Sequence, residues 1–187
     1  MVDITTLIMD DHENFRRWFA QLDELDDPAE LARVWEPLAR LLDLHAAAEE
    51  AVFYPELVQR GASPEDETLD AVGDHNEIRD AVHGAAQHPV GSSAWYQAVR
   101  AARVANGNHM AEEEYDALAD FRAHADAGLR EQLGRRFQEF KDEHPDASDI
   151  DTSDVDPQQY LRRVEGSSRQ AADGTSLGIG SLKGTVQ

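Results

Sequence analysis

Two pairs of residues in this sequence have the types and the spacing of metal ligands. His45 stands four residues before Glu49, and His109 stands four residues before Glu113. On an α-helix, side chains at this spacing lie on one face with their Cβ atoms about 5–6 Å apart, so each pair can bind one shared metal ion. Imidazole nitrogen and carboxylate oxygen together suit iron, and also manganese or zinc.

The absence of cysteine narrows this chemistry further. A chain of 187 residues with no cysteine cannot form disulfides, thiolate zinc sites, iron–sulfur clusters or a cysteine nucleophile. A metal centre in this chain must therefore be built from nitrogen and oxygen ligands.

Two further histidines, His12 and His75, lie on apolar stripes of predicted helices. A single histidine on such a stripe is more often a hydrogen-bonded core residue than a ligand. Here, however, one histidine falls near the middle of each of four predicted helices. Burying these four together with Glu49 and Glu113 at one level would be costly without a cation. Six ligands exceed the four of a tetrahedral zinc site and indicate two metal ions bridged by the carboxylates.

The elements that must position these side chains are four helices with apolar residues at every third or fourth position. Short turns rich in aspartate, glycine, proline and serine separate them. Helices joined in this way run antiparallel to their neighbours, so the predicted fold is all-α, an up-down-up-down antiparallel four-helix bundle. At about 1.5 Å per residue, this topology brings the four histidines to within about 6–8 Å of one level. The predicted helices span residues 4–25, 28–60, 65–87 and 93–125.

The rest of the chain divides into a further helix and a tail. An amphipathic stretch predicts an extra C-terminal helix at about 127–143, which follows the bundle core (4–125) and completes a domain of residues 1–144. Residues 145–187 are acidic and rich in serine and glycine. They predict a mostly disordered tail with one candidate short helix around 157–165.

The overall charge bears on the partners of the protein. There are 38 acidic against 17 basic side chains, and the formal net charge is −21. Such a chain lacks the basic surface that nucleic acid requires, so no nucleic-acid partner is expected, and anionic membrane surfaces are disfavoured. No segment reaches the roughly 18 apolar residues of a membrane span, and the N-terminus lacks the features of a signal peptide. A cytoplasmic location is therefore expected.

Together these residues resemble the haemerythrin-like, HHE cation-binding family. The segment LDLHAAAEEAVFYPEL is similar to the second helix of that family and NHMAEEEYDAL to its fourth, and the resemblance covers about residues 1–125. It implies a four-helix bundle around two non-haem iron ions with an oxygen-derived bridge. The ligands that it implies are four histidine nitrogens and two bridging carboxylates, from His12, His45, His75 and His109 and from Glu49 and Glu113.

Two positions depart from the oxygen-carrying members of the family. Arg79 stands where they have a second histidine on the third helix, and Glu114 stands where they have an aspartate on the fourth. These departures argue against reversible oxygen carriage and favour reaction with hydrogen peroxide, oxygen or nitric oxide. The Phe53-Tyr54-Pro55 segment looks closest to the actinobacterial haemerythrin-like group, for which catalase-like decomposition of peroxide is implied. Two alternatives stay open: a module that binds or senses O2, NO or iron without turnover, and a structural bundle stabilised by zinc or manganese.

Tyr54 and Arg79 are harder to place. Tyr54 follows Glu49 by five residues, which on a straight helix turns it about 140° away. An interface tyrosine with a solvated hydroxyl is therefore the preferred interpretation. The alternative is that Pro55 distorts the helix and turns the phenol inward, as a metal ligand, a hydrogen-bond donor or a radical site. Arg79 is expected on the bundle surface rather than beside a bridging carboxylate.

Three more sets of residues complete the expectations. Three carboxylates near the predicted ligands are expected to be solvated or to surround the site: Glu112, Glu50 and Glu114. Glu112, three residues after His109, is an alternative to Glu113 as a ligand. Histidines towards helix ends or turns are expected at the surface: His83, His88, His124 and His144. Apolar side chains are expected to line a dry cavity around the metals: Ile8, Phe15, Leu41, Val72 and Ile78.

Overall fold

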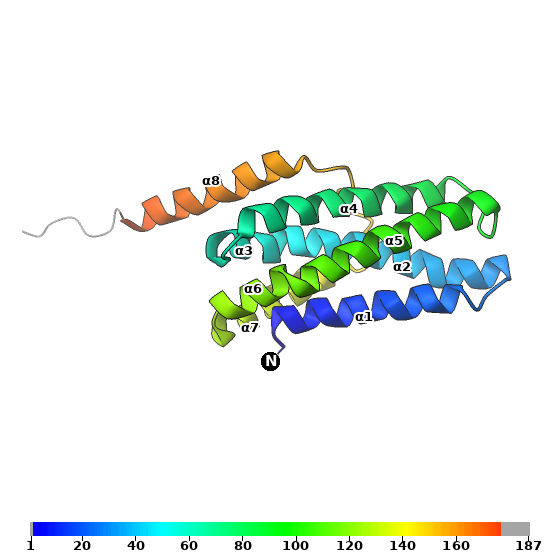
Figure 1. Cartoon of the computed structure of the whole chain (residues 1–187), viewed down its shortest axis with the longest axis horizontal. Coiled ribbons are helices and arrows are strands. Elements are labelled where there is room, and N and C mark those ends of the chain that lie inside the picture. The colour runs from blue at the N-terminus through cyan, green and yellow to red at the C-terminus, as the bar shows by residue number, and fades with distance from the viewer. Residues whose placement is uncertain (1, 177–187) are drawn as a thin grey trace, which may run out of the picture.

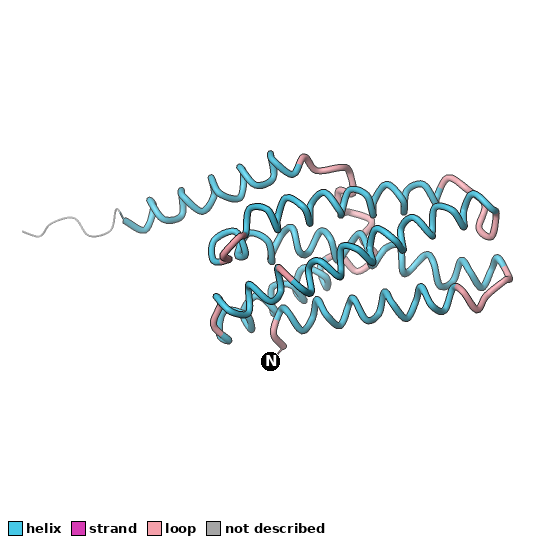
Figure 2. Tube along the Cα trace, viewed as in Figure 1, coloured by secondary structure: helices cyan, strands magenta, loops and turns pink. Residues whose placement is uncertain are grey.

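The computed structural model describes residues 2–176, in which four long helical segments lie side by side as a bundle (Figure 1). Every regular element in this range is helical, and only loops join the helices (Figure 2). The predicted all-α, up-down-up-down bundle is therefore confirmed. The first segment is α1 (Ile4–Leu22) and the third is α4 (Pro64–Ala86), whereas the second and fourth are each built from more than one element.

The second segment contains a widened turn. It consists of α2 (Pro28–Ala48), a π-helix (Glu49–Phe53) and α3 (Tyr54–Arg60). In a regular helix the ring of Pro55 would clash with the carbonyl four residues before it, and its nitrogen has no hydrogen to donate. The π-helix relieves this clash, and the Tyr54 N–H donates to the Glu49 carbonyl five residues earlier. The predicted helix over 28–60 is thus distorted beside a predicted metal ligand.

The fourth segment is interrupted once. It consists of α5 (Ser93–Tyr115) and α6 (Ala117–His124), where the sequence predicted one helix over 93–125. Asp116 separates the two with backbone angles of φ −103° and ψ −78°, so α6 continues close to the direction of α5 (Figure 1). The break lies just beyond Glu113 and leaves the register of His109 and Glu113 intact.

Apolar side chains form two separate clusters along the bundle. On α1, Ile8 belongs to the first apolar cluster and Phe15 to the second, and His12 lies between them. The same order recurs on α4 as Val72, His75 and Ile78. The histidines therefore form a polar layer between two hydrophobic ends.

Two further helices cover the outside of the bundle. α7 (Ala127–Glu143) is the extra helix that the sequence predicts, and it packs against α1 and the π-helix. α8 (Pro157–Ser176) runs along α3 and α4 (Figure 1). α8 is longer than the short helix expected in the tail, and its Tyr160 and Val164 are buried. Residues 177–187, also part of the predicted disordered tail, lie outside the described residues. None of the described helices is long and apolar enough to cross a membrane.

Candidate metal centre

Four histidine side chains meet inside the bundle, one each from α1, α2, α4 and α5. The ring centroids of His12 and His45 are 5.2 Å apart, and those of His75 and His109 are 4.6 Å apart. The rings of His12 and His109 lie at 6.4 Å. All four residues are buried, so the structure brings them to one level as the antiparallel topology predicted.

Glu49 lies between three of these rings. Its Oε1 is 3.0 Å from His45 Nε2, and its Oε2 is 3.3 Å from His75 Nε2 and 3.9 Å from His109 Nε2. The carboxylate is fully buried. One side chain from the second segment thus reaches imidazoles on three segments.

Glu113 faces the same space from α5. Its Oε2 lies 3.3 Å from His12 Nε2 and 3.9 Å from His109 Nε2. The potential ligand atoms form two groups, each within 4.8 Å: His12, His45, Glu49 and Glu113 in one, and Glu49, His75 and His109 in the other. Because the groups share Glu49, the arrangement is the one expected when a carboxylate bridges two metal ions.

Each histidine turns its Nδ1 toward a carboxylate on another segment, and the four pairs form a closed ring around the bundle, the carboxylate ring. In the three pairs at hydrogen-bond distance, the contact holds the proton on Nδ1 and directs the Nε2 lone pair to the centre. In every pair, the carboxylate stands next in the sequence to a predicted ligand, His12, Glu49, His75 or Glu113. The pairs are Asp11–His45 at 3.0 Å, Glu50–His75 at 2.9 Å, Asp74–His109 at 3.6 Å and Glu114–His12 at 2.9 Å.

The sequence analysis did not single out Asp11 or Asp74. A signal was present, because an acidic residue stands next to an inward-facing residue on each of the four segments. Adjacent residues on a helix point about 100° apart. An acidic neighbour of a ligand therefore points sideways, toward the next helix of the bundle, where it can meet an imidazole.

Cationic side chains hold three members of the carboxylate ring from outside. Arg79 donates to Glu50 Oε1 at 2.8 Å and is 2% exposed, so the surface position predicted for it is wrong. Burial opposes ionisation of Glu50, but its contacts with His75 and Arg79 keep its pKa below the ordinary value. The other two contacts are Arg16 to Glu114 and Lys141 to Asp11, each at 2.7 Å.

Four of the ligand atoms at the centre lack hydrogen-bond partners. His12 Nε2, His45 Nε2, Glu49 Oε1 and Glu113 Oε2 are buried without one, although they face one another at ion-pair distance. Unpaired buried donors and acceptors are costly. A cation bound between these nitrogen and oxygen atoms would satisfy them, so the residues fit a metal centre.

The electrostatics of the site agree with this fit. His75 Nε2 lies 3.3 Å from His109 Nε2, a contact that needs a proton or a cation between two nitrogens. Burial opposes charge on His75, but its contacts with Glu49 and Glu50 outweigh it and raise its pKa to about 9. The carboxylates beside His12 raise its pKa to about 9 against the same effect of burial. Protons thus balance the buried carboxylates, and metal ions would displace these protons on binding.

Tyr54 points into the centre because of the π-helix. Its hydroxyl donates to Glu113 Oε1 at 3.1 Å and lies 3.4 Å from Glu49 Oε2, and the residue is fully buried. The preferred interpretation of an interface tyrosine with a solvated hydroxyl is therefore wrong, because the phenol is turned inward and donates a hydrogen bond there. Burial, reinforced by Glu113 and Glu49, raises the pKa of Tyr54 well above its ordinary value, so the phenol keeps its proton.

The remaining candidates lie outside the two groups of ligand atoms. Glu112 is exposed whereas Glu113 is buried, so the four-residue spacing holds on α5. Among the described residues, neither group includes the histidines towards helix ends, His83, His88, His124 and His144. Leu41 is only partly buried, while the other predicted lining residues are buried: Ile8, Phe15, Val72 and Ile78.

Comparisons with known proteins agree with this geometry. Residues 3–121 match the family model described as "Hemerythrin HHE cation binding domain". Comparisons with curated proteins and with solved structures give no match. The matched range covers more than half of the chain and contains both groups of histidine and glutamate ligand atoms. These two groups therefore indicate a metal-binding module for iron. The chain belongs to the haemerythrin HHE cation-binding domain family.

Proposed function

We propose that this chain binds two iron ions inside the bundle and decomposes hydrogen peroxide. The observation that carries the proposal is that two groups of buried ligand atoms share Glu49. Each group would hold one ion, with Glu49 and Glu113 as bridging carboxylates. The proposed ligands are His12, His45, His75, His109, Glu49 and Glu113.

The donor set supports reaction with a small oxidant rather than a closed structural site. Six side chains supply too few donors to fill the coordination of two six-coordinate ions, so positions remain for H2O2, O2 or NO. Arg79 occupies the position of a further family histidine and binds Glu50 instead. The chemistry that iron supplies there is two-electron exchange, by which two molecules of hydrogen peroxide give two of water and one of oxygen.

The residues of the chain would do three things in this reaction. The carboxylate ring fixes the orientation of the four imidazoles. The two apolar clusters exclude bulk water on either side of the polar layer. Tyr54, which keeps its proton, donates a hydrogen bond to Glu113 and also lies 3.4 Å from Glu49 Oε2.

A second candidate function is binding or sensing of a small oxidant without turnover. The observation that favours it is the connection of the centre to α8. The Tyr160 hydroxyl donates to the Glu50 carbonyl at 2.6 Å, and the Glu50 side chain contacts His75. A change at the centre could therefore reach α8 through one residue.

The deciding experiment is metal analysis of protein purified from iron-replete cells, followed by an absorption spectrum and oxygen measurement after peroxide is added. Two iron ions per chain, absorption of an oxygen-bridged pair and oxygen evolution would support the proposal. Iron without oxygen evolution would favour binding or sensing. One zinc ion per chain would contradict both candidates.

Tyr54→Phe tests the role of the phenol. We expect the variant to keep two iron ions per chain, because Tyr54 is not among the proposed ligands and phenylalanine preserves the packing. Oxygen evolution should fall about 10- to 100-fold, the usual effect of losing a hydrogen bond to a metal ligand. Iron analysis and an oxygen electrode measure the two quantities. The exposed Tyr96→Phe is the matched control, and an unchanged rate in Tyr54→Phe would show that the phenol plays no part.

A further inference from the structure

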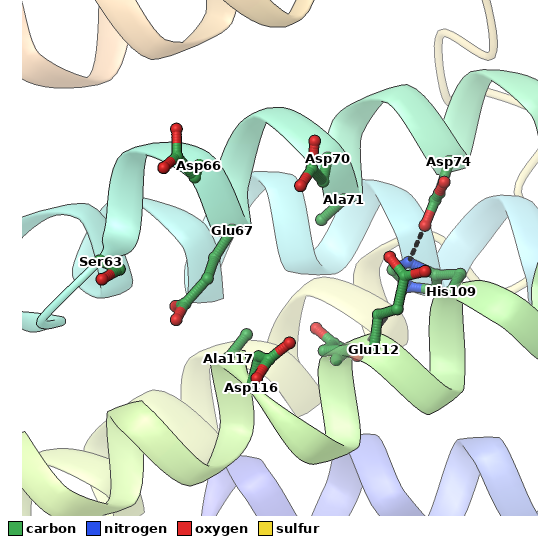
Figure 3. A pocket seen from close by; sticks show the side chains of 11 residues that line it. Ser63, Asp66, Glu67, Asp70, Ala71, Asp74, His109, Glu112, Asp116 and Ala117 are labelled. Carbon is green, nitrogen blue, oxygen red and sulfur yellow. Dashed lines mark ion pairs between the residues drawn. The ribbon is translucent and has the colours of Figure 1, made fainter.

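One pocket of the molecule opens onto the candidate metal centre. It has a volume of about 320 Å³ and lies between α4 on one side and α5 with α6 on the other (Figure 3). Seven of the residues that line it are acidic, and no described lysine or arginine lines it. We name it the acidic pocket, and these residues are Asp66, Glu67, Asp70, Asp74, Glu112, Glu113 and Asp116.

The acidic pocket reaches the proposed ligands directly. His109 and Glu113 both line it, and both are buried. Glu113 Oε2 has no hydrogen-bond partner, so an unpaired carboxylate oxygen lies where the pocket meets the centre. Figure 3 shows Asp66, Asp70 and Asp74 along α4, with Asp74 directed at His109.

The charge of this pocket is not balanced from outside. Arginine or lysine holds the other three members of the carboxylate ring, whereas Asp74 has no such partner among the described residues. Glu67 Oε2 is buried without a hydrogen-bond partner. Burial, with Asp120 and Asp116 nearby, raises the pKa of Glu67 to about 7. Crowded carboxylates of this kind are relieved by a divalent cation.

We infer that the acidic pocket is the access route by which a divalent cation passes from solvent to the candidate metal centre. This inference rests on the proposed function, since it supposes that the centre takes up metal. A cleft lined by one sign of charge concentrates the opposite ion and can raise association rates by about 10- to 1000-fold. The carboxylates along α4 attract the cation, and His109 and Glu113 receive it at the inner end.

The test removes charge at the outer part of the route and leaves the ligands unchanged. Asp66→Asn with Asp70→Asn neutralises two exposed carboxylates that line the pocket. Glu65→Gln with Asp80→Asn is the matched control, because it removes the same charge from exposed positions of the same helix outside the pocket. Circular dichroism verifies that each variant keeps its helices.

Ferrous iron is added without oxygen to the metal-free full-length chain, and the iron that a colorimetric chelator still captures is followed over time. We expect the pocket variant to load about 3- to 10-fold more slowly than wild type at low salt, and the difference to shrink at about 0.5 M salt. The final iron content should match wild type. The proposed ligands are unchanged in the pocket variant, so its affinity for iron should stay nearly the same. Because the affinity is the ratio of the loading and release rates, iron loss from the loaded variant to a chelator should slow by a similar factor.

The outcomes separate the two proposals. A wild-type chain that takes up no iron overturns the proposed centre. A wild type that loads two iron ions, with a pocket variant that loads and releases them at wild-type rates, overturns the access route alone. An equal slowing in the control variant also overturns the route, because general charge would then explain the effect.

Discussion

Replacing Glu113 with glutamine is expected to remove most of the iron that the purified chain carries. Glutamine keeps the shape of the side chain but loses the negative charge that faces His12 and His109. Removal of a ligand should weaken metal binding by at least about 100-fold, since loss of a residue that only supports a ligand already costs 10- to 100-fold. Iron per chain, measured after purification from iron-replete cells, gives the result.

Glu112→Gln is the matched control for this prediction. It is the same substitution one residue earlier on α5, at an exposed position, and it should keep two iron ions per chain. His45→Ala should lose iron as Glu113→Gln does, because it removes an imidazole from the same group of ligand atoms. Retention of full iron in both ligand variants would contradict the proposed ligand set.

Replacing Arg79 with methionine is expected to destabilise the protein by about 3 kcal/mol, the lower end of the usual cost of breaking a buried ion pair, because Glu50 keeps its contact with His75. Arg79 is buried and donates to Glu50, which is largely buried beside His75. Methionine keeps much of the aliphatic stem but leaves Glu50 without the guanidinium. Denaturant unfolding of the iron-free variant and the iron-free wild type, under identical conditions, measures the difference.

Arg103→Met provides the comparison for an exposed pair. Arg103 contacts Asp23 at 2.8 Å, but both side chains are about half exposed. Its loss should change the free energy of unfolding by at most about 1 kcal/mol, as for other surface salt bridges. Equal effects of the two variants would mean that burial of Arg79 does not govern its contribution.

Much of the candidate site could be predicted because it depends on helical periodicity. The four-residue spacing from His45 to Glu49 and from His109 to Glu113 places each pair on one face. Short turns then fix antiparallel neighbours and bring the middles of the helices together. These two regularities are enough to assemble six buried side chains from four segments.

The parts that were missed depend on departures from that periodicity or on contacts between helices. Tyr54 faces the centre only because the turn before Pro55 is widened, and a straight helix would direct it elsewhere. The position of Arg79 follows from Glu50, which reaches across from the neighbouring segment. A one-dimensional pattern describes one helix face at a time, so it does not reveal which acidic neighbour meets which imidazole.

The polar layer between the two apolar clusters bears on how the bundle opens. Each cluster has its own buried aromatic side chains, such as Phe53 and Phe121 in the first and Trp35 and Trp95 in the second. The molecule is therefore two half-bundles that meet at a plane of imidazoles and carboxylates. Parts of a protein with separate cores can unfold locally and independently. Metal ions at that plane would act as a cross-link and make the two halves one cooperative unit.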